Sequence, residues 1–222
     1  MTQSKSSATQ SWLGTSNAVL RGLNHEFSNL LSFASLAPPL SALLAARAPE
    51  LQKPAEDTVD SEGLLHLLRL YRLMVFDANE PAEAILVMDV VADAVALFRR
   101  HTTFRDLDVR VNADATIPPV LIEPTALTQA VLLLLCVAAR QQSVTPGDRG
   151  TILMDFGADT NAVRIFTQAA DADRHDARGD PPELSALRYL IRDVEGTVDV
   201  TRGGVTMSIG TLVRLRQREN RG

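Results

Sequence analysis

The residues of this chain whose types and spacing could support chemistry lie near its N-terminal end: His25, Glu26 and Asn29. In a helix, residues four positions apart share a face, so His25 and Asn29 would lie together with Glu26 beside them. A solvent-facing neutral imidazole flanked by an acid and an amide can act as a nucleophile. Most exposed histidines on helices have no such role, so the rest of the chain must distinguish the two interpretations.

The apolar residues around this segment predict a helix that buries another face. They recur at the spacings of three and four that are typical of a helix seam in a bundle: Leu20, Leu23, Phe27, Leu30, Ala34 and Ala37. We expect the helix to run from about Ser11 to about Arg47. Proline removes a backbone donor and clashes with the preceding turn, so a kink or restart is expected at Pro38-Pro39.

A second helix is expected from about Ala55 to Asp77. Its apolar residues are spaced four, three and four apart: Leu64, Leu68, Tyr71 and Val75. Two long helices joined by a short connection form a hairpin. Two helices cannot enclose a core, so we expect two copies of the chain to pair as a homodimeric four-helix bundle.

After Asn79-Glu80-Pro81 the pattern changes to short apolar segments that alternate with helical ones. Strands are expected near 84–88, 107–111, 120–122, 151–156, 162–167, 198–200 and 205–209, and helices near 89–100, 124–142 and 183–194. This order predicts an α/β two-layer sandwich, with a sheet against helices. The fold class predicted for the whole chain is therefore α+β.

Composition narrows the class of protein. The chain has 222 residues, 45% of them hydrophobic, and a net charge of −5, which argues against a nucleic-acid partner. Its single cysteine, Cys136, lies in an apolar helix and indicates a buried thiol in a reducing compartment. The N-terminus has no apolar core of the kind found in signal peptides, and the longest apolar run stops at Arg140. We expect a soluble cytoplasmic protein with no membrane contact.

The order of these elements resembles the core of sensor histidine kinases. Residues 25–31 resemble the phosphoacceptor box, residues 128–138 the helix that carries the Asn-rich box, and residues 184–198 the last helix and strand of the ATP-binding domain. The resemblance extends over about residues 15–215. It implies a helical-hairpin phosphoacceptor domain followed by an ATPase-like domain.

The positions that this resemblance assigns to ATP binding carry other residues. The asparagines that hold Mg²⁺ and phosphate are matched by Leu133 and Val137, which have no oxygen for a hard cation. The adenine-binding Asp-x-Gly-x-Gly loop is matched by 168–173, which reads Gln-Ala-Ala-Asp-Ala-Asp. The second glycine loop, 179–183, reads Gly-Asp-Pro-Pro-Glu and lacks clustered backbone N–H groups for a triphosphate. We therefore expect no ATP binding and no cofactor.

A phosphoacceptor hairpin on such a degenerate domain is similar to the ChpT-like histidine phosphotransferases of bacterial phosphorelays. The resemblance implies a homodimer that moves a phosphoryl group between the aspartates of response-regulator receiver domains, including those of hybrid histidine kinases. His25 would carry the phosphoryl group, Glu26 would orient the imidazole by holding its second nitrogen, and Asn29 would position phosphate oxygens or a water. Mg²⁺ would arrive with the receiver. Ser28, Asn29 and Ser32 would contact the receiver, and Gly22 would help to leave the helix surface open.

This interpretation divides the chain into a disordered N-terminus (1–10), a hairpin for dimerisation and phosphotransfer (11–79) and a degenerate ATPase-like domain (80–222). The protein would form a phosphohistidine intermediate and would not be an ATP-dependent kinase. Two alternatives remain open. One is a divergent histidine kinase or receiver phosphatase that binds nucleotide through unusual residues, and the other is a non-catalytic pseudokinase scaffold that binds a receiver.

Other histidines and acids are weaker candidates. His66 is expected at the edge of the bundle, and His101 at the end of a helix, where it would complement the helix dipole. The segment 171–176 combines three aspartates with His175, but its spacing is not that of a metal site. No arrangement for nucleophilic catalysis by a serine or cysteine can be argued.

Overall fold

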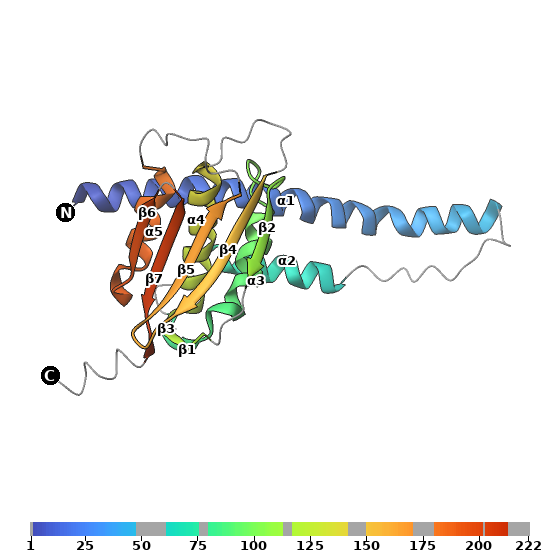
Figure 1. The fold of residues 1–222 in the computed structure, drawn as a ribbon. Helices are drawn as coiled ribbons and strands as arrows, with labels where there is room; N and C mark the ends of the chain where they lie inside the picture. The colour runs from blue at the N-terminus through green and yellow to red at the C-terminus, as the bar shows by residue number, and fades with distance from the viewer. Residues whose placement is uncertain are drawn as a thin grey trace.

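The computed structural model describes residues 2–47, 61–75, 80–112, 117–141, 150–170, 180–201 and 203–212. Its helices are α1 (Thr2–Arg47), α2 (Ser61–Leu73), α3 (Val87–Phe98), α4 (Pro124–Gln141) and α5 (Pro182–Leu190), with a 3₁₀ turn at Arg192–Val194 (Figure 1). Its strands are β1 (Glu83–Ile85), β2 (Asp108–Asn112), β3 (Val120–Ile122), β4 (Thr151–Ala158), β5 (Ala162–Ala169), β6 (Thr197–Thr201) and β7 (Gly204–Gly210).

Five of the strands form one sheet in the order β2-β4-β5-β7-β6, and β1 pairs with β3 in a separate two-stranded sheet. Only β2 and β4 run parallel in the larger sheet; its other neighbours are antiparallel. A strand lies at or near each expected position, and the last two strands, β6 and β7, pair as an antiparallel hairpin. One boundary differs from the expectation: the strand expected at 84–88 ends at Ile85, because Val87 and Met88 already belong to α3.

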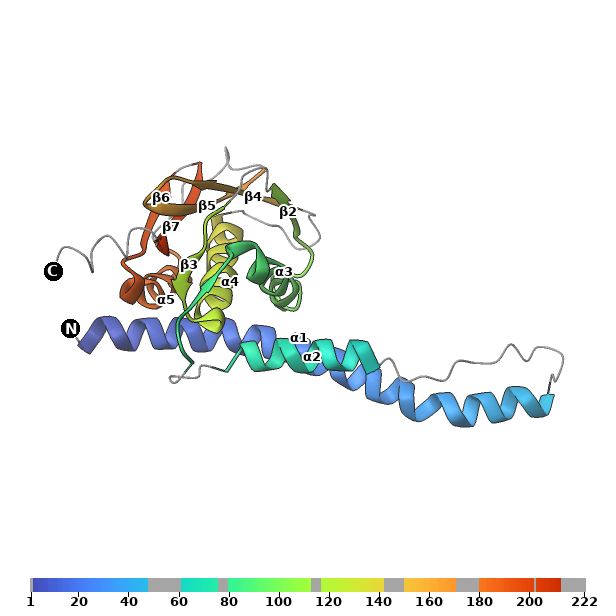
Figure 2. The same cartoon turned by 90° about the horizontal axis from the view of Figure 1, so that it is seen from below.

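The sandwich has a helical layer made of α3, α4 and α5 against one face of the sheet, and α1 crosses the other side of that layer (Figure 2). The predicted α+β fold, with a sheet packed on helices, is therefore present. Helix α4 is its centre: every residue from Thr125 to Ala139 is buried. By length and composition α4 could span a membrane, but 78% of it is buried inside the structure, as is typical of a core helix. No other helix among the described residues meets that criterion.

Helix α2 lies beside the middle of α1 and runs in the opposite direction, as the predicted hairpin requires (Figure 2). Helix α1 continues through Pro38-Pro39, so of the kink or restart expected there the restart is absent. Helix α2 begins at Ser61 and ends at Leu73, and the residues expected to extend it, 55–60 and 76–77, lie outside the described part of the chain. Ala34 and Ala37 of the expected seam belong to α1, but their side chains are not among those described.

The first half of α1 packs on the sandwich, chiefly against α5. Ala8, Thr15, Val19 and Leu23 are buried there. Residues 2–10, for which we expected disorder, are therefore the first turns of this helix. The polar composition of that segment predicted disorder because its apolar contact, a helix far along the chain, cannot be read from local sequence.

Candidate functional site

His25 and Asn29 lie on the exposed face of α1 and are hydrogen-bonded to each other. The Asn29 Nδ2 lies 3.1 Å from His25 Nδ1, so the amide donates to that ring nitrogen. The two ends of an amide can exchange by a half-turn of the side chain. With Oδ1 facing the ring, Nδ1–H donates instead, and Nε2 keeps its lone pair toward solvent. With its amide in this second orientation, Asn29 selects the tautomer in which Nε2 is the nucleophile.

Glu26 was expected to hold the imidazole. Instead it pairs with Arg100, which lies just after the end of α3. The Arg100 Nε donates to Glu26 Oε2 at 2.7 Å, and Arg100 Nη2 donates to Glu26 Oε1 at 2.8 Å. Both carboxylate oxygens are thus engaged in a two-pronged ion pair, which is the strongest geometry available to arginine and a carboxylate. Asn29, and not Glu26, contacts the imidazole, and Glu26 instead ties the hairpin to the sandwich.

Gly22 lies one turn before Glu26 and makes the second contact with Arg100. A Cβ built on Gly22 would lie only 1.9 Å from the carbonyl oxygen of Arg100. Gly22 was expected to leave the helix surface around His25 open. Instead it lets the backbone of α1 touch the backbone of Arg100. Together the contacts of Gly22 and Glu26 fix the height and rotation of α1 on the sandwich, and hence the position of His25.

The residues expected to meet a receiver share the exposed face with His25. Ser28, Asn29 and Ser32 are all exposed, and the Ser28 hydroxyl donates to the carbonyl oxygen of Asn24 at 2.8 Å. The structure thus brings His25 and these three residues together on one side of α1. Arg100 was not predicted as part of this site. The local sequence contains one signal of a close contact here, which is Gly22 inside an otherwise regular helix.

The two positions matched to the metal-binding asparagines carry apolar side chains that face the core. Leu133 and Val137 are fully buried in α4. Part of the expected nucleotide loops, residues 171–179, lies outside the described residues, as does the possible metal segment 171–176. Where α4 ends beside α5, Arg140 pairs with the buried Glu183 at 3.1 Å. The C-terminal end of α4 therefore carries an ion pair between Arg140 and Glu183.

His101 and Phe104 extend that group. The Arg140 guanidinium lies 5.2 Å from the centre of the Phe104 ring, and the His101 ring stacks on Phe104 with centroids 4.4 Å apart. Burial, with the charge of Arg140 as the smaller cause, lowers the pKa of His101 to about 4. The Thr103 backbone N–H donates to its Nδ1. His101 is therefore neutral near pH 7. The expectation that it complements the helix dipole with a charge is wrong.

Cys136 is fully buried, as its apolar helix predicted. Burial raises the pKa of its thiol well above the ordinary value, and the Glu183 carboxylate raises it further. A thiol with a raised pKa is a poor nucleophile at neutral pH. Cys136 therefore has no place in the candidate site.

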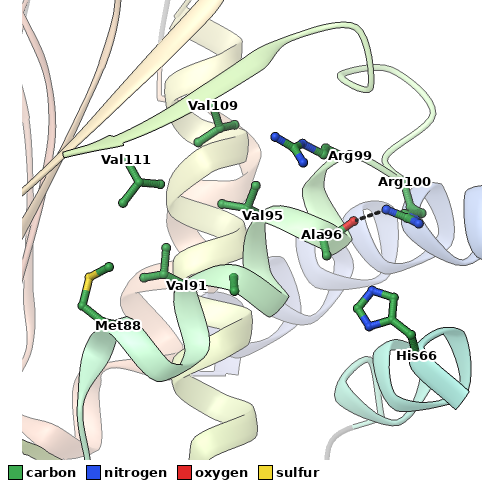
Figure 3. Close-up of a pocket in the computed structure, with 10 residues that line it drawn as sticks. His66, Met88, Val91, Val95, Ala96, Arg99, Arg100, Val109 and Val111 are labelled. Carbon is green, nitrogen blue, oxygen red and sulfur yellow. Dashed lines mark hydrogen bonds between the residues drawn. The ribbon is translucent and has the colours of Figure 1, made fainter. Parts of the chain in front are cut away.

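A groove of about 560 Å³ lies between the hairpin and the sandwich, beside Arg100 (Figure 3). His66 of α2 faces α3 across it, and Val109 and Val111 of β2 line its far side. His66 is exposed, in agreement with the edge position expected for it. The groove shares Arg100 with the contact that positions His25.

No family model matches the sequence. No curated protein matches it either. Among solved structures, the chain is similar to a histidine kinase from Burkholderia phymatum, with 14% identity over 90% of this chain and 96% of that one and a TM-score of 0.44. It is similar to the histidine kinase domain of a blue-light activated histidine kinase from Erythrobacter litoralis, with 17% identity over 91% and 96% of the two chains and a TM-score of 0.45. It is also similar to the mycobacterial sensor histidine kinase MprB, with 15% identity over 59% and 98% and a TM-score of 0.43.

Proposed function

We propose that this chain is a histidine phosphotransferase that relays a phosphoryl group between receiver aspartates through His25, without using ATP. The observation that carries the proposal is the exposed His25 imidazole, held by Asn29 one turn further along α1 at 3.1 Å. This arrangement leaves one ring nitrogen facing solvent, where a partner protein can reach it. The buried Leu133 and Val137 support the second half of the proposal, because they offer no oxygen to a nucleotide-bound metal.

The transfer follows from the chemistry of the two carriers. The Nε2 lone pair of His25 attacks the phosphorus of a receiver's aspartyl phosphate, the P–O bond to the aspartate breaks, and the receiver carboxylate is released. In the second step the carboxylate of another receiver attacks the same phosphorus and the P–N bond breaks, which restores the imidazole. Mg²⁺ that accompanies the receiver would neutralise charge during both steps. The compartment that this role requires is the cytoplasm.

The direct test is to mix the purified protein with a radiolabelled, phosphorylated receiver domain in the presence of Mg²⁺. We expect an acid-labile label on this chain, because a phosphoramidate is cleaved in acid. Peptide mapping should place the label on His25. If no receiver from the genome that encodes this chain gives such a label, the proposal is wrong.

ATP should leave the stability of the protein unchanged. A ligand that binds the folded state must raise its stability, and a site with a dissociation constant of about 0.1 mM would add roughly 2 kcal/mol at about 5 mM ATP. We expect the melting temperature with ATP and Mg²⁺ to equal that without either. A clear rise in melting temperature with ATP would favour the divergent kinase. A scaffold that binds a receiver without phosphotransfer would show neither this rise nor the label on His25.

We further propose that two copies pair through α2 and the neighbouring part of α1. Four large apolar residues of α2 and the turn that follows it remain exposed in the single chain, between 44% and 65%: Leu65, Leu68, Tyr71 and Val75. Three of them, Leu68, Tyr71 and Val75, belong to the predicted seam, and Leu31 of α1 is 50% exposed as well. A surface of this kind indicates a protein partner, and a second copy provides the matching stripe for a four-helix bundle.

The substitution Leu68→Asp should convert the dimer into a monomer, because an unpaired carboxylate in an apolar interface costs several kcal/mol. Light scattering at micromolar concentration checks this, with twice the chain mass expected for the unmodified protein. Leu13→Asp is a matched control, since Leu13 is 52% exposed on the first half of α1. An unmodified protein that is monomeric under these conditions would contradict the bundle.

A further inference from the structure

The groove between the hairpin and the sandwich combines an apolar floor with a basic rim. Met88, Val91 and Val95 of α3 line it together with Val109 and Val111 of β2. Its ionisable lining residues, within the described part of the chain, are His66, Arg99 and Arg100, so none of them is acidic. Figure 3 shows Arg99, Arg100 and His66 at one end, with Met88 and Val111 at the other.

Two ion pairs hold the walls of this groove in place. Arg69 of α2 donates to Asp93 of α3 at 2.6 Å, and Arg100 is held by Glu26 of α1. Asp93 is largely buried, with 12% of its side chain exposed, so this pair is better shielded from solvent than one on an open surface. The groove is therefore formed before a partner arrives, and Val111 on its floor is still 39% exposed.

We propose that this groove is the docking site for an amphipathic helix of the receiver, with an apolar face flanked by acidic residues. This inference rests on the proposed function. A receiver that brings its aspartyl phosphate to His25 must approach the surface beside Glu26, and Glu26 is bonded to a residue that lines the groove. An apolar helix face would cover the valines and Met88, and its acidic flank would meet Arg99 and His66.

The lining of the groove and the separate apolar stripe on the hairpin support this occupant over a second copy. The ionisable side chains that line this groove within the described part of the chain are basic, so the groove favours a helix with an acidic flank. The apolar stripe proposed for the dimer uses Leu65, Leu68, Tyr71 and Val75, whereas the groove uses His66 of the same helix. Both surfaces can therefore be occupied at once.

The test uses the receiver domain that labels His25, titrated into the full-length protein by calorimetry. Arg99 is exposed at the rim, so Arg99→Glu should leave the melting temperature unchanged. We expect it to weaken receiver binding at least tenfold and to slow labelling equally at low receiver concentration, but to leave the rate at saturation unchanged. Arg110→Glu is the matched control. It lies between Val109 and Val111 on β2, points to the opposite face of the sheet, and should change binding less than twofold.

The possible results separate this inference from the function on which it rests. If His25 is labelled but Arg99→Glu binds the receiver as tightly as the unmodified protein, the groove is not the docking site and the phosphotransfer function stands. If Arg99→Glu turns a dimer into a monomer, the groove is an interface between copies and the inference is wrong. If no receiver labels His25, both proposals fail.

Discussion

Replacing His25 with glutamine is expected to remove phosphoryl acceptance completely while leaving the fold unchanged. Glutamine can still form a hydrogen bond with the Asn29 side chain, but its amide nitrogen has no lone pair available to attack phosphorus. His25 is exposed and contributes to the site through its hydrogen bond to Asn29, so its loss should not alter packing. The expected result is a label at background level and an unchanged melting temperature.

The histidine of the neighbouring helix provides the control for that experiment. His66 is also exposed, but it lies on α2 at the groove. His66→Gln should accept the phosphoryl group when the receiver is present at saturation. If the label persists on His25→Gln and disappears on His66→Gln, the nucleophile is His66 on α2 and the proposal is wrong.

The second large effect concerns Gly22, where an alanine should destabilise the protein by about 2–3 kcal/mol. The added Cβ would meet the carbonyl oxygen of Arg100 at 1.9 Å and its carbon at 2.8 Å, and both are backbone atoms that cannot rotate away. Overpacking of this kind typically costs about 1–3 kcal/mol. Relief would require α1 to lift off the sandwich, which would also separate Glu26 from Arg100. Urea unfolding of both proteins measures the difference.

Gly14 is a matched control for this substitution, because it lies on the same helix and nothing lies within 4 Å of its added Cβ. Alanine is favoured over glycine inside a helix by about 1 kcal/mol. Gly14→Ala should therefore stabilise the protein slightly, whereas Gly22→Ala should destabilise it. If both substitutions stabilise the protein equally, α1 does not contact the sandwich at Gly22 in solution.

Residue patterns were sufficient to predict the elements and the face on which His25 lies. The three-and-four spacing through Leu20, Leu23, Phe27 and Leu30 placed these residues toward the core, where the structure has them buried or half-buried. His25 and Asn29 then had to lie off that seam because a helix has 3.6 residues per turn. The β6–β7 hairpin was equally local, since alternating strands joined by a short glycine-containing turn predict their own pairing.

The contacts that fix the site could not be predicted in the same way, because they join residues far apart in the sequence. Glu26 and Arg100 are 74 positions apart, and Ser11 and Ser185, whose hydroxyls lie 3.2 Å apart, are 174 apart. The role first given to Glu26 followed from its position next to His25. A surface carboxylate pairs with whichever cation the tertiary fold brings to it, and the local sequence does not contain that information.

The continuity of α1 has a consequence for insertions and deletions in this chain. One unbroken helix carries both Ser11, which meets α5, and Glu26, which meets Arg100, so the number of residues between them decides whether both contacts can form at once and hold His25 in its observed direction. Each residue of a helix advances about 100° around its axis and about 1.5 Å along it. Adding one residue between Ser11 and Gly22 would turn the Ser11 contact by about 100° relative to the contacts of Gly22 and Glu26, and adding four would restore the angle within about 40° but displace the two sets of contacts by about 6 Å. The length of this segment is therefore constrained by helical phase as strictly as its composition is constrained by packing.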